Sequence, residues 1–279
     1  MTRTNKRRAA LLRLAEGGVM LCLATILSVF KLADLPYGGS ITLGSLFPIV
    51  LLSYRHGTGF GLLCGLVYGV IQQLLGLNTL SYFSTWYSIV AIILLDYVLA
   101  FAAAGLGGIF RNKMKNKGAA LLLGGFTVCF VRYICHVISG CTVWAGMSIP
   151  TGGALAYSFI YNATYMIPET VILAMICYYL GNSLDFTLQI PKRIKRSDLP
   201  FSDWARLLGG GVLLGGLIFD VTRIFAKLQN AETGEFDLTA LTGAPLSFYL
   251  PLLIVTVAAV GIFALLALLA RRFDKKKMN

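Results

Sequence analysis

The sequence is short of charged residues and of the side chains that carry chemistry. Charged residues make up 13% of its 279 residues, about half the share of a typical soluble domain, which argues against a soluble protein. Only two histidines are present, and the six cysteines form no CxxC pair, so we expect neither a metal site nor a disulfide framework. A GxxxxGK[ST] phosphate loop is also absent. We therefore expect no cofactor and no ATPase activity of the chain's own.

Long apolar runs dominate the chain instead. Hydrophobic residues make up 57% of the sequence, and a helix needs about 20 apolar residues to cross about 30 Å of hydrocarbon. The sequence therefore predicts an all-α, polytopic transmembrane helical protein. The second run is short and contains Pro48, which predicts a kinked or partly re-entrant helix. The predicted helices span residues 10–33, 41–54, 58–77, 88–110, 119–141, 154–181, 204–229 and 246–270.

The basic residues predict how these helices are oriented. The net charge is +12, but the basic residues form short clusters between apolar runs rather than a basic face, so we expect no nucleic-acid binding. The clusters fall in every second loop, and the positive-inside rule places such loops in the cytoplasm. We therefore expect a multi-pass protein of the cell (cytoplasmic) membrane with both termini cytoplasmic. The clusters lie at residues 3–13, 55, 111–117, 192–196 and 271–277.

A basic segment divides the predicted helices into two groups. Residues 182–203 contain two prolines and four basic residues, a composition typical of a cytoplasmic linker. Residues 1–181 then form a six-helix unit, and residues 204–279 contain a C-terminal transmembrane hairpin whose role the sequence leaves open. Asp220 and Arg223 lie three apart on the first helix of this hairpin and are predicted to pair with each other.

Polar and aromatic residues gather at one depth of the six-helix unit. Ionisable residues in a bilayer are costly and are functional candidates. The predicted orientations place Asp96 and His136 near the outer side, at the same depth as several polar and aromatic residues. These groups offer hydrogen bonds and aromatic faces that hold cations, so we expect an outward-open pocket for a small, positively charged heterocycle. Deeper in the bilayer, Arg132 and Glu169 are predicted to form a structural salt bridge. The pocket set is Asp96, Tyr97, His136, Gly140, Trp144, Tyr157 and Asn162.

From about residue 14 to residue 181 the sequence resembles a known family. The resemblance is carried by EGGVMLCLATILSV in the first helix and by ITLGSLFPIVLLSYRHGTGFGLLCGLVYG across the second and third. It continues in LLDYVLAFAAAGLGG of the fourth helix and in HVISGCTVWAG and YSFIYNATYMIPE around the fifth and sixth. These stretches are similar to the thiamine-specific substrate-binding (S) component of energy-coupling factor (ECF) transporters, the ThiT/YuaJ thiamine transporter family.

The resemblance implies thiamine (vitamin B1) uptake together with a transmembrane ECF coupling subunit and two ATPase subunits. It also implies which residues contact the ligand, although the family usually has a glutamate where Asp96 stands, so the carboxylate here is one methylene shorter. The implied contacts are Asp96, Tyr157, Asn162 and His136 for the aminopyrimidine, Trp144 for the thiazolium, and Gly140 and Tyr97 for the hydroxyethyl arm.

Two further pairs follow from the same resemblance. Tyr68 and Gln72, one turn apart on the third helix, are weaker ligand candidates. Gly18 and Cys22 stand where the family has a pair of small residues that dock the coupling subunit, and small residues permit close helix approach in lipid.

Other functions remain open at this point. A membrane-embedded enzyme is one, because Asp96, His136 and Ser139 contain the residue types of a hydrolytic triad. However, the sequence has no HExxH or GxSxG motif. An S component for another vitamin or a thiamine precursor is a second alternative, and a solitary carrier without coupling partners is a third.

Overall fold

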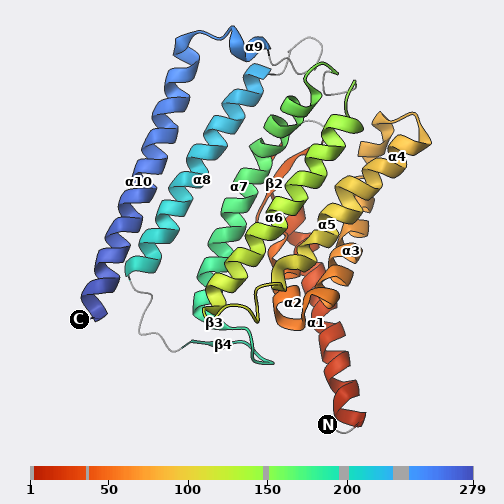
Figure 1. Ribbon diagram of the computed structural model, residues 1–279, viewed down its shortest axis with the longest axis vertical. Coiled ribbons are helices and arrows are strands. Elements are labelled where there is room, and N and C mark those ends of the chain that lie inside the picture. Colours follow the sequence, from red (N-terminus) through yellow and green to blue (C-terminus); the bar gives the residue numbers. More distant parts are fainter. Residues whose placement is uncertain (1–2, 36–37, 147–150, 195–200, 229–238, 279) are drawn as a thin grey trace.

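The computed structural model describes residues 3–35, 38–146, 151–194, 201–228 and 239–278, and it confirms an all-α polytopic membrane protein. Within these ranges, seven helical segments are long and apolar enough to cross a membrane. Helix α1 begins and helix α10 ends at the same end of the bundle, which we call the terminal end; the opposite end is the distal end (Figure 1). The seven segments are α1 (Arg3–Val29), α3 (Thr58–Leu75), the composite segment from α4 to η4 (Trp86–Gly108), α6 (Lys117–Thr142), α7 (Ala154–Ser183), α8 (Phe201–Leu228) and α10 (Leu246–Met278).

The short helix predicted at residues 41–54 is present only in its second part, and its first residues form a strand. Helix α2 (Phe47–His56) has only 10 residues, a length of about 15 Å. Strand β2 (Ser40–Thr42) precedes it and pairs antiparallel with β1 (Lys31–Asp34). Pro48 lies in the first turn of α2, where its missing N–H removes no helical hydrogen bond, so it starts the helix and does not kink it. Together β2 and α2 return the chain to the terminal end (Figure 1).

The composite fourth segment is helical but irregular. Helix α4 (Trp86–Ile92) continues into the π-helical turn η3 (Ile93–Leu99), the short α5 (Ala100–Ala102) and the 3-10 turn η4 (Ala103–Gly108). Turn η4 crosses its neighbours very closely. A Cβ atom on Gly105 would lie 2.2 Å from the Leu62 nitrogen, and one on Gly124 of α6 would lie 1.9 Å from the Gly107 oxygen. Such small-residue contacts hold helices together in lipid, where apolar surface alone supplies no driving force.

The linker predicted at 182–203 is partly folded. Strands β3 (Leu184–Asp185) and β4 (Lys192–Arg193) pair antiparallel, and residues 195–200 lie outside the described ranges. The guanidinium of Arg55 on α2 donates hydrogen bonds to the carbonyl oxygens of Phe186 (3.0 Å), Leu188 (3.2 Å) and Gln189 (3.0 Å). This one buried side chain therefore fixes the start of the linker against the six-helix unit.

The C-terminal hairpin lies on one side of the bundle. Helix α8 packs against α7, and α10 packs against α8 on the side farthest from α1 (Figure 1). The predicted pairing of Asp220 with Arg223 is wrong. The Asp220 carboxylate accepts a hydrogen bond from the Thr256 hydroxyl of α10 (2.5 Å), and the Arg223 guanidinium lies 5.5 Å from the centre of the Phe219 ring. Within the described ranges no ion pair joins the two residues.

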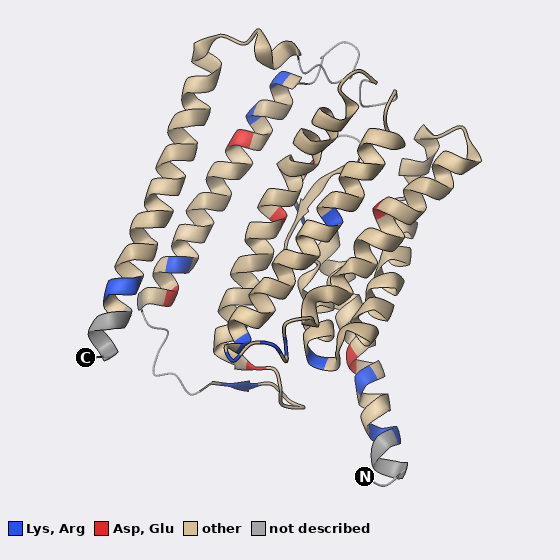
Figure 2. Ribbon diagram, in the orientation of Figure 1, with Lys and Arg blue, Asp and Glu red and all other residues tan. Residues whose placement is uncertain are grey.

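Charged residues gather at the terminal end. Most lysines and arginines that Figure 2 draws in blue lie there, near the start of α1, in the segment after η4, in β4 and near the end of α10. Arg223 and Lys227 on the last turns of α8 are exceptions at the distal end. The acidic residues predicted for a distal loop, Glu232, Glu235 and Asp237, lie outside the described ranges.

Candidate functional site

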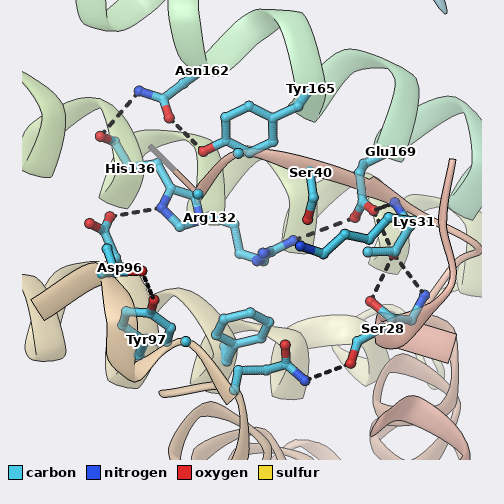
Figure 3. Close-up of a pocket in the computed structure, with 18 of the residues that line it drawn as sticks. Ser28, Lys31, Ser40, Asp96, Tyr97, Arg132, His136, Asn162, Tyr165 and Glu169 are labelled. Carbon is cyan, nitrogen blue, oxygen red and sulfur yellow. Dashed lines mark hydrogen bonds and ion pairs between the residues drawn. The ribbon is translucent and has the colours of Figure 1, made fainter. Parts of the chain in front are cut away.

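A cavity of about 430 Å³ opens between α1, β2, α3, η3, α6 and α7. All seven residues of the predicted pocket set line it. They come from the distal halves of α6 and α7, from the residues just after α6 and from the π-helical turn, so the predicted convergence of these residues agrees with the structure (Figure 3). The volume falls within the roughly 300–1,000 Å³ of small-molecule sites.

Asp96 is the centre of the distal half of the cavity. Its Oδ1 accepts a hydrogen bond from Nδ1 of His136 (2.8 Å), and its Oδ2 accepts from the Ser139 hydroxyl (2.6 Å) and the Trp144 indole nitrogen (3.3 Å). All three donors come from the last turns of α6 or the residues just after it. A carboxylate has about four acceptor positions, so Asp96 keeps roughly one for a ligand. Nε2 of His136 is buried and has no hydrogen-bond partner among the described residues.

Helices α6 and α7 each present a stripe of residues at intervals of four. Arg132, His136 and Gly140 form the stripe on α6, and Trp144 follows at the same spacing just beyond the helix. Residues four apart lie on one helix face. On α7 the stripe of cavity residues is Tyr157, Tyr161, Tyr165 and Glu169.

Tyr161 and Tyr165 were missed from the sequence, although their spacing from Tyr157 is a usable signal. Both line the cavity. The Tyr165 ring lies 6.1 Å from the His136 ring, and the Tyr161 ring lies 5.9 Å from the Tyr165 ring. The Tyr161 hydroxyl accepts a hydrogen bond from the Gly39 backbone nitrogen (3.2 Å) in the connection between β1 and β2.

Asn162 lies between these stripes and holds the two helices together. Its side-chain nitrogen donates to the carbonyl oxygens of Ser158 (2.9 Å) and His136 (3.3 Å), and its side-chain oxygen accepts from the Tyr165 hydroxyl (2.6 Å). The Asn162 amide therefore already has protein partners. These contacts support a structural role beside the cavity. Only the second acceptor position of the Asn162 side-chain oxygen remains for the predicted ligand contact.

The predicted salt bridge between Arg132 and Glu169 is present in the deeper part of the cavity, with 3.9 Å between Nη1 and Oε2 (Figure 3). Both side chains are buried. The other oxygen of Glu169 accepts from the backbone nitrogen (2.5 Å) and the hydroxyl (2.6 Å) of Thr42. The Arg132 guanidinium also lies 4.6 Å from the centre of the Phe101 ring. This pair therefore joins α6 and α7 to strand β2 and η3–α5.

The remaining predicted ligand residues fall in different places. The Tyr97 hydroxyl donates to Thr79 (3.4 Å), and the Gln72 amide donates to Ser28 (2.9 Å), and both residues line the cavity. Tyr68 does not line it. Its fully buried side chain packs against Phe101, and its hydroxyl donates to the carbonyl oxygen of Ala24 (3.2 Å). Tyr68 thus ties α3 to α1.

Gly18 and Cys22 lie on the exposed side of α1, away from the cavity. A Cβ atom added to Gly18 would meet nothing within 4 Å. Helix α1 is also one of the two least buried spans. This face is open to lipid or to another membrane protein.

The arrangement differs from that of a hydrolytic triad. In such a triad the histidine lies between the acid and the nucleophile and takes the proton of the hydroxyl. Here the Ser139 hydroxyl donates directly to Asp96, as does His136. In the part of the chain that the structure describes, no three His, Cys, Asp or Glu side chains gather in a way that could hold a metal ion.

A polar and aromatic cavity enclosed by membrane helices defines a membrane protein that holds a small ligand between its helices. The comparisons with known proteins identify which kind. The family described as "Thiamine transporter protein (Thia_YuaJ)" matches residues 14–188. The chain is also 35% identical over 178 residues to the "Thiamine transporter ThiT" of Bacillus subtilis (strain 168), an alignment that covers 60% of this chain and 88% of the relative. The chain belongs to the thiamine transporter family, whose members are transporters and not enzymes.

The buried ion pair predicts the behaviour of two variants of the ligand-free protein. Glu169→Gln leaves the Arg132 cation buried without its counter-charge, so we expect a loss of about 3–5 kcal/mol of stability and a lower thermal unfolding midpoint in detergent. Replacing both residues, as in Arg132→Met with Glu169→Gln, should restore much of the loss. A double variant as unstable as Glu169→Gln would contradict the pairing.

Proposed function

We propose that this protein takes up thiamine by capturing it in the cavity from outside the cell. The observation that carries the proposal is the Asp96 cluster, an anionic group with aromatic neighbours inside the membrane part of a thiamine transporter family member. Thiamine joins a thiazolium cation to an aminopyrimidine. A carboxylate and an indole ring suit the cation, and hydrogen-bond acceptors suit the amino group.

The cluster leaves acceptors that have no protein partner among the described residues and that suit the amino group of the aminopyrimidine. Nδ1 of His136 donates to Asp96, so in the neutral imidazole Nε2 is an acceptor. Together with the remaining acceptor position on Asp96, this gives two acceptors for the two N–H groups of the ligand's amine. Tyr157 and Asn162 complete this side of the cavity, and Trp144, Gly140 and Tyr97 are the proposed contacts of the thiazolium and the hydroxyethyl arm.

The orientation is part of the same proposal. The lysines and arginines at the terminal end support a cytoplasmic location of both termini in the cell membrane. The cavity is formed by the distal halves of its helices, so it then faces the outside. Because the sequence carries no phosphate-binding loop, energy for delivery to the cytoplasm comes from an ECF coupling subunit with two ATPase subunits. The exposed face of α1 at Gly18 and Cys22 is the proposed docking surface.

Removing the charge of Asp96 tests the binding site. Asp96→Asn removes the negative charge and the acceptor position left for the ligand, so the bound ligand loses a charged hydrogen-bond partner, which costs about 1–3 kcal/mol, or about 5- to 150-fold in affinity. Calorimetric titration of the purified protein with thiamine measures this change. Asp220→Asn, which removes a carboxylate of α8 outside the cavity, is the control and should bind normally. Equal affinity of Asp96→Asn and wild type would remove Asp96 from the site, and a wild-type protein that binds no thiamine would refute the proposal.

A bulky residue on α1 tests the docking surface. In Gly18→Leu the cavity is unchanged, so thiamine binding should stay normal. A close contact between α1 and the coupling subunit would lose about 1–3 kcal/mol, or about 5- to 150-fold in the association of the two proteins. Uptake of labelled thiamine by cells that contain the ECF partners should fall accordingly. Gly211→Leu on α8, where an added Cβ also meets nothing within 4 Å, should leave uptake unchanged. Loss of binding in Gly18→Leu would contradict the docking role.

A further inference from the structure

The C-terminal hairpin lies outside the family match, which ends at residue 188, yet it contacts the wall of the cavity. Helix α8 packs along α7. Three of its residues, Val221, Phe225 and Leu228, belong to the same buried cluster as Trp144 and Tyr157 of the cavity. On this side Tyr157 and Tyr161 lie between α8 and the cavity, because both line the cavity and both lie against Phe225 and Leu228 of α8.

A row of ring contacts leads from α8 to the binding cluster. The buried Phe225 ring lies 5.6 Å from the Tyr161 ring at an interplanar angle of 62°. Tyr161 contacts Tyr165 (5.9 Å), and Tyr165 contacts His136 (6.1 Å). Each contact is edge-to-face, a favoured geometry for aromatic pairs. Phe225 is therefore three ring contacts away from the histidine that holds Asp96.

Tyr161 also supports a second wall of the cavity. Its hydroxyl accepts the hydrogen bond from the Gly39 nitrogen (3.2 Å), and Gly38 and Gly39 line the cavity from the β1–β2 connection. The fit is close: a Cβ atom on Gly39 would lie 2.9 Å from both the Tyr161 hydroxyl and a ring carbon of Tyr165. A movement of Tyr161 therefore changes the position of this connection as well as of α7.

The other end of α8 is fixed to α7 by polar contacts. The Arg206 guanidinium of α8 donates to the Tyr178 hydroxyl of α7 (2.7 Å), and that hydroxyl donates to the Asp203 carboxylate of α8 (3.4 Å). One turn further, Gly210 allows the Met175 side chain to approach closely, since a Cβ atom there would lie 2.9 Å from its sulfur. Helix α8 is thus held along most of α7, and Phe225 is kept in place behind Tyr161.

We propose that α8 is a positioning element for the ligand cavity and that Phe225 is the residue through which it acts. By filling the space behind Tyr161, Phe225 restricts that side chain to the rotamer that holds Gly39 and Tyr165. Rigidity of this kind improves binding by reducing the ordering cost on association. The effect on thiamine rests on the proposed function, whereas the restraint on Gly39 does not.

The test uses the full-length protein and compares Phe225→Ala with Phe263→Ala. Phe263 lies on α10 beside Gly209 of α8, away from the cavity, and is the aromatic control, with a side chain more exposed than that of Phe225. In Phe225→Ala, bound labelled thiamine chased with unlabelled thiamine should dissociate about 2- to 10-fold faster, the effect of releasing about one side chain. Phe225→Leu, which keeps most of the apolar volume, should restore the slow rate, and Phe263→Ala should match the wild type.

A second measurement needs no ligand. Amide hydrogen exchange of the segment 38–42 should be faster in ligand-free Phe225→Ala than in the wild type or in Phe263→Ala. Tyr161→Phe, which removes the acceptor of the Gly39 bond, should have a similar effect, and combining it with Phe225→Ala should give less than the sum of both. Unchanged exchange in Phe225→Ala would overturn the proposal. If the wild type bound no thiamine, the proposed function would fail, while the exchange result would still decide the role of Phe225.

Discussion

The site depends on the hydrogen bonds that the Asp96 carboxylate accepts. A charged group inside a membrane is costly unless it is paired and hydrogen-bonded. Here one donor to Oδ1 and two to Oδ2 satisfy it, and all three come from the distal end of α6 and the residues just beyond. The carboxylate therefore joins the π-helical turn η3 to α6. It also orients the imidazole of His136 and the indole of Trp144 toward one space.

A second buried charge pair organises the deeper part of the cavity. Arg132 and Glu169 lie on facing stripes of α6 and α7, and Glu169 also accepts from both donors of Thr42 in β2. The cost of burying these charges is offset only while the partners stay together. The two acidic residues thus have different roles. Asp96 keeps an acceptor position for a ligand, whereas Glu169 holds strand β2 in place.

Much of this architecture could be predicted from the sequence, because membrane burial imposes simple rules on length and charge. The apolar runs and the alternating basic loops predicted the helices, and their directions placed seven separate residues at one depth. The run 41–54 misled because Ile41, Leu43 and Leu46 continue the apolar pattern of α2 toward its start, so composition could not separate strand β2 from the helix. The π-helical turn at Asp96 has no sequence pattern that distinguishes it from an α-helix, so the sequence did not predict it. The pairing of Asp220 with Arg223 failed because Thr256 comes from another helix, which spacing within α8 does not reveal.

The protein combines the six-helix unit that the family match covers with a hairpin that we propose supports the cavity wall. Residues 14–188 hold every residue of the proposed ligand site, and α8 covers the outer face of that unit at Tyr161. The hairpin lies on the side of the bundle away from α1, so it leaves the proposed docking face at Gly18 and Cys22 uncovered. An even number of added crossings also keeps both termini at one end.

The central claim is that thiamine binds beside Trp144 at the Asp96 cluster. The chain has three tryptophans, so a protein carrying Trp86→Phe and Trp204→Phe reports on Trp144 alone. Titration of this protein with thiamine should quench its emission in a saturable way, with the same affinity that calorimetry measures. Binding detected by calorimetry without any change in Trp144 emission would place the ligand elsewhere and contradict the account.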